Sequence, residues 1–249
     1  EYETIGMFGA NLEIDDLDTI ARCNYLCNDL GLDTIETAVA IGLAMQAGVL
    51  PFGDRAGVLN LLPAIGRGTT VLGRVLGQGA AVTGRVLGVT NIPAVKGQAL
   101  PAYDPRSLKG IGVTYATSPM GADHTAGPTA RAKVDHLNPQ GQVELSRRVQ
   151  LNSAIYDNLG LCLFVTAAVG ARPQILADLL NARYGWQWGV EDLFELSKKT
   201  ILMEREFNRR AGFTPAHDRL PEFFCTEPLP ETNSVFDVPQ EEVEDCHNF

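Results

Sequence analysis

The spacing of apolar and polar residues predicts helices along most of the chain. Between residues 12 and 27, apolar residues recur at helical spacing among acidic ones, and a second helix is expected over 34–47, ending at Gly48. Further helices are expected over 173–183, 190–197 and 198–211, and a long apolar-periodic stretch covers 141–172. Strict apolar–polar alternation, which is typical of strands, is scarce. We therefore predict an all-α, multihelical fold.

Two stretches divide this pattern. Residues 56–89 are rich in glycine and nearly repeat themselves. Small residues at these intervals permit close helix packing, and the glycine spacing of a phosphate-binding loop is absent. Prolines and glycine then gather from Thr90 to Pro105. We therefore expect two helical domains, 1–98 and 99–249.

Two later segments carry few helical signals. Residues 107–136 collect small and polar side chains, and loops of this kind often carry function. The tail from Thr226 is rich in proline and glutamate, so we expect it to be extended and partly mobile.

Composition and charge narrow the class of protein. The 249 residues are 45% hydrophobic and 20% charged, which is typical of a soluble globular protein with a sizeable core. The net charge of −10 argues against nucleic acid and anionic membrane surfaces as partners. Arginines interrupt every apolar window long enough to span a membrane. The first residues resemble no secretion signal, so we expect a cytoplasmic protein.

The cysteines also favour a reducing compartment. Their number is odd and their spacing irregular, unlike a secreted disulfide framework. Cys23 and Cys27 would share one face of a helix and could ligate a metal together, but matching ligands are missing nearby, so we expect core thiols. From the residues alone, Cys162 would also be interpreted as a buried core cysteine. The five are Cys23, Cys27, Cys162, Cys225 and Cys246.

A repeated six-residue motif is the best functional signal. Asn-Asp-Leu-Gly-Leu-Asp at 28–33 returns as Asp-Asn-Leu-Gly-Leu-Cys at 157–162, with glycine where the backbone turns most easily. Asp33 followed by Glu36 predicts a helix N-cap with its partner, and a helix start suits an anionic or hydrogen-bonding ligand. Two such turns could hold a pseudo-symmetric ligand between them. The alternative is two ordinary helix–helix turns.

Six blocks in order resemble one known family, the tungsten-dependent aldehyde ferredoxin oxidoreductases. The blocks are Glu-Tyr-Glu-Thr at 1–4, Cys-Asn-Asp-Leu-Gly-Leu-Asp-Thr-Ile at 27–35, Tyr-Asp-Pro-Arg at 103–106, Ala-Thr-Ser-Pro-Met-Gly-Ala-Asp-His at 116–124, the motif at 157–162, and Phe-Asn-Arg-Arg-Ala-Gly at 207–212. The resemblance implies that the chain corresponds to the two helical C-terminal domains of that family. The family's β-rich N-terminal domain, with the Cys-x-x-Cys-x-x-x-Cys run that ligates an iron–sulfur cluster, is not in this sequence.

The resemblance also implies a cofactor site. A tungsten (or molybdenum) bis-pterin would be held by the two motifs, and Cys162 would be the fourth ligand of a [4Fe-4S] cluster, whose other three ligands lie outside this chain. The pterin-binding residues would be Asn28, Gly31, Leu32, Asp33, Asp157, Gly160 and Leu161. Asn28 stands where the family often has Asp, and its amide still accepts a hydrogen bond.

The implied reaction oxidises aldehydes to carboxylic acids and passes electrons through the cluster to ferredoxin. Glu3 and His124 fall where the family places groups beside the metal, and both can move protons. Their plain alternatives are a solvated terminal glutamate and a loop histidine. Met120 stands where an Arg is common, which points to a different substrate or sub-branch.

The resemblance predicts that both motifs face one cavity onto which Glu3 and His124 open. The expected partners are the missing N-terminal domain of the same protein, ferredoxin and a small aldehyde, with a homo-oligomer as a further possibility. A second hypothesis is a cofactor-free helical interaction or assembly module derived from that family.

Overall fold

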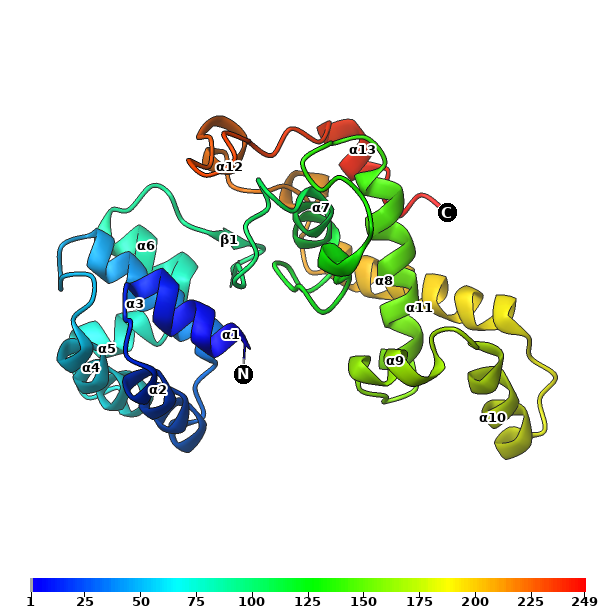
Figure 1. Cartoon of the computed structure of the whole chain (residues 1–249), viewed down its shortest axis with the longest axis horizontal. Coiled ribbons are helices and arrows are strands. Elements are labelled where there is room, and N and C mark those ends of the chain that lie inside the picture. Colours follow the sequence, from blue (N-terminus) through cyan, green and yellow to red (C-terminus); the bar gives the residue numbers. More distant parts are fainter. Residues whose placement is uncertain (1) are drawn as a thin grey trace. The chain divides into compact units, whose positions relative to one another are not determined.

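A computed structural model describes residues 2–249, and it confirms the all-α prediction (Figure 1). Within these residues the one sheet is a two-stranded hairpin in which β1 (Ala94–Val95) pairs antiparallel with β2 (Gln98–Ala99). No single helix in this range is long and apolar enough to cross a membrane; one pair bent by 101°, Leu163–Val169 with Gln174–Tyr184, passes that test of length and composition together.

The backbone packs into two compact units. Unit 1 contains the chain up to Asp104 together with Met120–Asp123 and Leu220–Pro228. Unit 2 contains Pro105–Pro119, His124–Arg219 and Leu229–Phe249.

Unit 1 is a cluster of helices around the buried helix α3. Its largest fully buried side chains include Phe8, Leu12, Ile41 and Leu62. In Figure 1, α3 lies among α1, α2 and α6, and it packs most closely against α6. The elements are α1 (Tyr2–Thr4), the π-helix η1 (Ile5–Gly9), the 3-10 helix η2 (Ala10–Leu12), α2 (Leu17–Leu30), α3 (Thr34–Gln46), α4 (Arg55–Arg67), α5 (Val71–Leu76), α6 (Ala80–Leu87), β1, β2 and α12 (Phe223–Thr226).

Local signals explain where these helices begin. The helix predicted over 12–27 starts only at Leu17, because Glu13 adopts a left-handed conformation and the Asp16 side chain accepts the Thr19 N–H at 2.9 Å. The helix predicted over 34–47 is confirmed as α3. The glycine-rich stretch forms α4, α5 and α6, and a Cβ on Gly73 would lie 2.3 Å from the Ala64 carbonyl oxygen, so close helix packing is confirmed.

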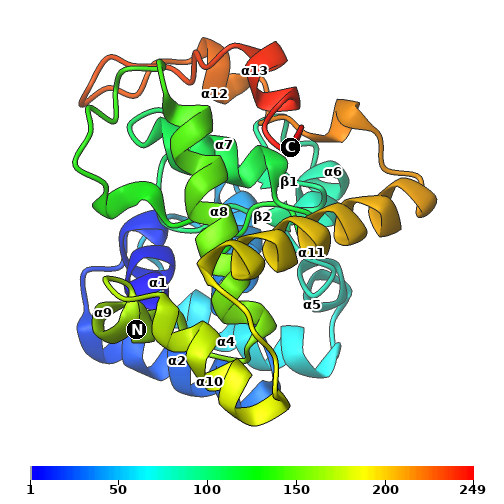
Figure 2. The ribbon, with the colours of Figure 1, turned by 90° about the vertical axis from the view of Figure 1, so that its right-hand side faces the viewer.

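Unit 2 is built on three helices, α7, α8 and α11, and α11 crosses α8 (Figure 2). A small cluster of Ile155, Tyr156, Leu176 and Leu193 joins α8, α10 and α11. The elements are α7 (Lys109–Thr117), η3 (Thr129–Arg131), α8 (Gln142–Asn158), η4 (Leu163–Val165), α9 (Thr166–Val169), α10 (Gln174–Tyr184), α11 (Val190–Arg210), η5 (Pro215–His217) and α13 (Gln240–Glu244).

Three sequence predictions about unit 2 need correction. The segment 107–136 contains α7, which the hydrophobic pattern misses because every residue of this helix is buried and no polar face marks its period. The two helices predicted over 190–197 and 198–211 form one continuous helix, α11. The C-terminal tail is tethered rather than mobile, since Phe236, Val243 and Cys246 are buried and Asp237 pairs with buried Lys109.

Candidate functional site

The two copies of the repeated motif end their helices with the same backbone geometry. Gly31 follows α2 with φ +68°, and Gly160 follows α8 with φ +65°. In the first copy the Leu32 N–H donates to the Cys27 carbonyl at 2.8 Å, and in the second Leu161 N–H donates to the Tyr156 carbonyl at 2.9 Å. Both are six-residue helix C-caps that require a left-handed residue. The repeat in sequence is therefore a repeat in conformation.

Both turns are open to their surroundings. A Cβ built on Gly31 or Gly160 would meet no atom within 4 Å. Asn28 and Asp33 are exposed beside the first turn, and Asp157 and Cys162 beside the second. The exposed polar side chains and bare glycine backbone leave room for a flat, hydrogen-bonding ligand to approach each turn closely.

The two copies differ in the residues after the turn. Asp33 is the N-cap of α3, as predicted, and its carboxylate accepts the Glu36 N–H at 2.7 Å. The Glu36 side chain does not reach back to Asp33. Its two oxygens accept the N–H groups of Ala80 at 2.6 Å and Ala99 at 2.8 Å, so Glu36 joins α3 to the start of α6 and to β2.

The cysteines fall into buried and exposed classes. Cys23 and Cys27 are fully buried in α2, where burial raises their thiol pKa values to about 11 and about 12, so the prediction of core thiols is confirmed. Cys162 is exposed, and its prediction as a core cysteine is wrong. Across residues 2–249 no three His, Cys, Asp or Glu side chains converge as a metal site. An exposed lone thiol fits one ligand of a cluster whose other ligands come from elsewhere.

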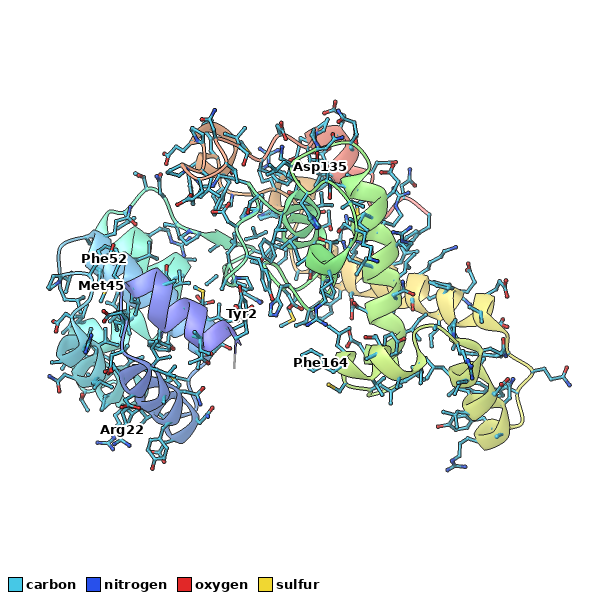
Figure 3. The ribbon with its side chains drawn as sticks, in the orientation of Figure 1. Tyr2, Arg22, Met45, Phe52, Asp135 and Phe164 are labelled. Atoms are coloured by element: carbon cyan, nitrogen blue, oxygen red, sulfur yellow. The ribbon has the colours of Figure 1, made fainter. Side chains whose placement is uncertain are left out.

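Glu3 is a buried carboxylate rather than a solvated terminal one. It is 5% exposed, and one of its oxygens accepts the Ala102 N–H at 2.8 Å. Gly6 permits this approach, because a Cβ there would lie 2.6 Å from the Ala102 Cβ. The Tyr2 ring, labelled in Figure 3, packs against Tyr103 with centroids 5.3 Å apart.

The helix that carries Glu3 also contacts the first motif's surroundings. The Thr4 hydroxyl lies 3.2 Å from the Asn24 side-chain oxygen in α2 and 3.3 Å from the Thr34 hydroxyl in α3. Glu3 and the Asn28–Asp33 motif therefore belong to one hydrogen-bonded part of unit 1.

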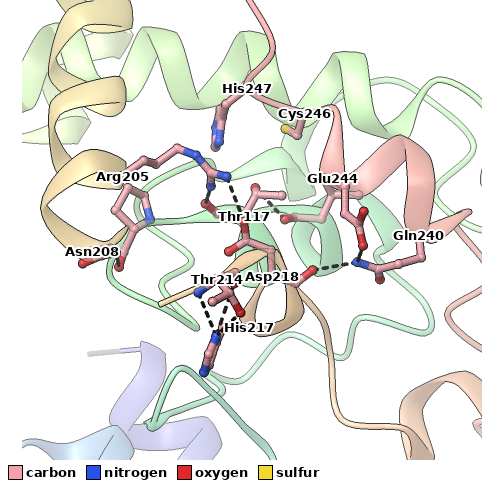
Figure 4. Close-up of polar contacts among 12 residues, drawn as sticks. Thr117, Arg205, Asn208, Thr214, His217, Asp218, Gln240, Glu244, Cys246 and His247 are labelled. Atoms are coloured by element: carbon pink, nitrogen blue, oxygen red, sulfur yellow. Dashed lines mark hydrogen bonds and ion pairs between the residues drawn. The ribbon is translucent and has the colours of Figure 1, made fainter. Parts of the chain in front are cut away.

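His124 is half-buried on the loop that connects α7 to η3. Two side chains of α11 hold the chain where it leaves α7. Arg205 donates to the Thr117 carbonyl at 3.3 Å (Figure 4), and Asn208 donates to the Pro119 carbonyl at 2.6 Å. Arg205 also pairs with buried Asp218 at 2.9 Å. These contacts hold the chain as far as Pro119, where it enters the loop that carries His124.

Sequence reasoning missed Glu204, which lies beside the second motif. The Thr200 hydroxyl donates to the Asn158 side chain at 3.0 Å, and Glu204 follows one helical turn later on α11. Glu204 is exposed, but partial desolvation of its carboxyl group and then the negative charge of Asp157 raise its pKa. The i, i+4 spacing of Thr200 and Glu204 is visible in the sequence, but the crossing of α11 over α8 is not.

The site residues therefore occur in two sets. The first motif and Glu3 are in unit 1, whereas the second motif, Cys162 and His124 are in unit 2. That the two sets face a common cavity stays a prediction.

Comparisons with known proteins give one consistent match. A family model described as aldehyde ferredoxin oxidoreductase, domains 2 and 3, matches residues 1–246. The chain is 32% identical over 255 aligned positions to the tungsten-containing aldehyde ferredoxin oxidoreductase of Pyrococcus furiosus, and 34% identical over 258 positions to that of Thermococcus kodakarensis. Each alignment covers 93% of this chain but 42% of the relative, so the chain spans less than half the length of these relatives.

Proposed function

Because the chain belongs to the aldehyde ferredoxin oxidoreductase family, whose domains 2 and 3 it matches, we propose that it forms the helical part of a tungsten (or molybdenum) bis-pterin enzyme. The enzyme oxidises aldehydes to carboxylic acids and passes the electrons through a [4Fe-4S] cluster to ferredoxin. The observation that carries this proposal is the repeated motif, whose two copies share one C-cap geometry and leave open space beside both glycines.

The residues present fit this cofactor. The motif at 28–33 would hold one pterin and the motif at 157–161 the other, through carboxylate or amide oxygens and the backbone around Gly31 and Gly160. The Cys162 thiolate would be one ligand of the cluster. When bound, the metal accepts the two electrons released by the aldehyde.

Glu3 and His124 would accept and release the protons of the reaction. Oxidation of a hydrated aldehyde to an acid releases two electrons and two protons, so groups that accept and release protons are needed beside the substrate. A carboxylate and an imidazole are suited to this work, and an imidazole ordinarily titrates nearest neutrality. Burial of Glu3 shields its carboxylate from bulk water.

Metal analysis of the full-length gene product tests the proposal. Anaerobically purified protein is expected to contain tungsten or molybdenum and about four irons per chain, and to reduce ferredoxin when an aldehyde is added. A full-length protein with neither metal nor iron would favour the cofactor-free assembly module instead.

His124→Asn tests the proton-transfer role in that full-length protein. Asparagine keeps much of the shape but cannot exchange a proton near neutral pH, so aldehyde oxidation is expected to fall by about 10² to 10⁴ with the metal content unchanged. His217→Asn is the matched control, because His217 is exposed and contacts its own turn at Thr214. Full activity in His124→Asn would make His124 an ordinary loop residue, and loss of metal would make its role structural.

A further inference from the structure

A chain of buried polar side chains runs through the interior of unit 2. The His247 Nε2 lies 3.0 Å from the Gln150 Oε1, and the Gln150 Nε2 lies 3.0 Å from the Ser146 Oγ. The Ser146 Oγ is 2.7 Å from the Thr114 Oγ1, which in turn is 3.0 Å from the Gly127 carbonyl oxygen. None of these four side chains is more than 6% exposed, so bulk water does not compete for their hydrogen bonds.

The Gln150 amide determines which groups donate and which accept along this row of buried hydrogen bonds. Its Nε2 carries two hydrogens, and these meet the Ser146 hydroxyl at 3.0 Å and the Thr117 hydroxyl at 2.9 Å. Its Oε1 is left as the acceptor for a hydrogen on the His247 Nε2. Figure 4 shows His247 and Thr117 in this part of unit 2. The Thr117 hydroxyl donates its own hydrogen to the Val113 carbonyl at 2.8 Å, so it accepts from Gln150, and this fixes which way the amide is turned.

The same order of donors and acceptors extends to the loop that carries His124. Because Ser146 accepts from Gln150, its own hydrogen is available to Thr114, and the Thr114 hydrogen is then available to a carbonyl. The Gly127 oxygen is nearer, at 3.0 Å, than the Gly110 oxygen, at 3.2 Å. A Cβ on Gly127 would lie 2.7 Å from the Gln150 Cγ, so the loop backbone rests directly on the network.

We propose that Thr114, Ser146 and Gln150 are positioning residues that hold the loop segment His124–Gly127 in place, so that His124 meets the substrate in a fixed orientation. The proposal rests on the proposed function. Arg205 and Asn208 anchor the start of this connection at Thr117 and Pro119, and the buried network anchors it again at Gly127. Because its end at Gly127 is held, the segment His124–Gly127 loses conformational freedom.

Hydrogen exchange of the full-length protein tests the positioning role. Thr114→Val keeps the side-chain volume but removes the hydroxyl, so the amides of residues 124–127 are expected to exchange roughly 10-fold faster, as for loss of one buried hydrogen bond. Thr114→Ser retains the hydroxyl and is expected to keep the protection. Ser197→Ala is the control, because its buried hydroxyl bonds the Leu193 carbonyl within its own helix. Unchanged exchange at 124–127 in both Thr114→Val and Ser146→Ala would overturn the proposal.

Turnover separates this proposal from the proposed function. In the metal-loaded protein, Thr114→Val is expected to lower kcat by on the order of 10-fold with KM and metal content unchanged, and Thr114→Ser to restore it. Faster exchange with an unchanged kcat would overturn the catalytic part of the proposal. A wild-type protein that holds no metal and oxidises no aldehyde would overturn the proposed function, whereas the exchange result would still decide whether the network orders the loop.

Discussion

Glu36 shows how a single side chain joins three elements of unit 1. It sits near the start of α3, and its two oxygens accept the backbone N–H groups of Ala80 and Ala99. These N–H groups are at the first residue of α6 and in β2. The carboxylate thus satisfies donors that helix and strand geometry leave free.

Glu36→Gln is expected to lower the free energy of unfolding by about 1–3 kcal/mol, because the new NH₂ group would face one of the two N–H donors. Urea denaturation followed by circular dichroism measures this change. Glu13→Gln is the control, since Glu13 is exposed. Equal stability of the two variants would show that Glu36 contributes no more than a surface carboxylate.

Glu204 is expected to make the free energy of unfolding depend on pH. Partial desolvation of its carboxyl group and then the Asp157 charge raise the pKa of Glu204 in the folded state. The contribution of Glu204 to stability is therefore fully present below the unfolded pKa and is lost as the pH rises through the folded pKa. Glu204→Gln removes this loss and is expected to raise the melting temperature at pH 7. The difference should shrink below about pH 4, where an ordinary glutamate is protonated. A variant that melts lower than wild type at pH 7 would contradict the prediction.

At the scale of elements, the two motif turns end α2 and α8 in the same way. Gly31 and Gly160 both have φ near +65° to +68°, and neither would bring a Cβ into contact with another atom. The cost of a side chain at either site is therefore the cost of the left-handed backbone alone.

Gly31→Ala and Gly160→Ala are each expected to destabilise the protein by about 1–2 kcal/mol. Asparagine visits this conformation more readily than alanine, so Gly→Asn at the same sites should cost less. Denaturant titration of the four variants checks both statements. If alanine were neutral at one site only, the two turns would not be equivalent in solution.

At the scale of the whole chain, the 249 residues alone are expected to hold no [4Fe-4S] cluster. Such a cluster takes four ligands, and Cys162 is the one cysteine that the family resemblance assigns to it. Cys23, Cys27 and Cys246 are buried, so Cys162 and Cys225 are the exposed cysteines, two fewer than a cluster takes. The cluster content is measured by absorption spectra and by iron and sulfide assays after anaerobic reconstitution. A brown preparation with stoichiometric iron and sulfide would contradict the prediction.

Features that depend on neighbouring residues could be predicted from the sequence. Gly31 and Gly160 end helices because glycine alone takes φ > 0 without strain, and Asp33 begins one because its carboxylate reaches the N–H three residues on. The all-α class follows from the helical period. Family blocks, rather than physical pattern, pointed to Glu3, His124 and Cys162.

Features that depend on distant residues were decided by the tertiary structure. Helix α7 is buried on every side, so its sequence carries no period, and Glu36 found its partners in α6 and β2 rather than in its own helix turn. The exposure of Cys162 and the approach of Glu204 to Asp157 follow from where α8 ends and where α11 crosses it. Local hydrogen bonds depend on residues that are close in sequence, whereas the burial and electrostatic environment of a side chain are set only when elements distant in sequence pack together.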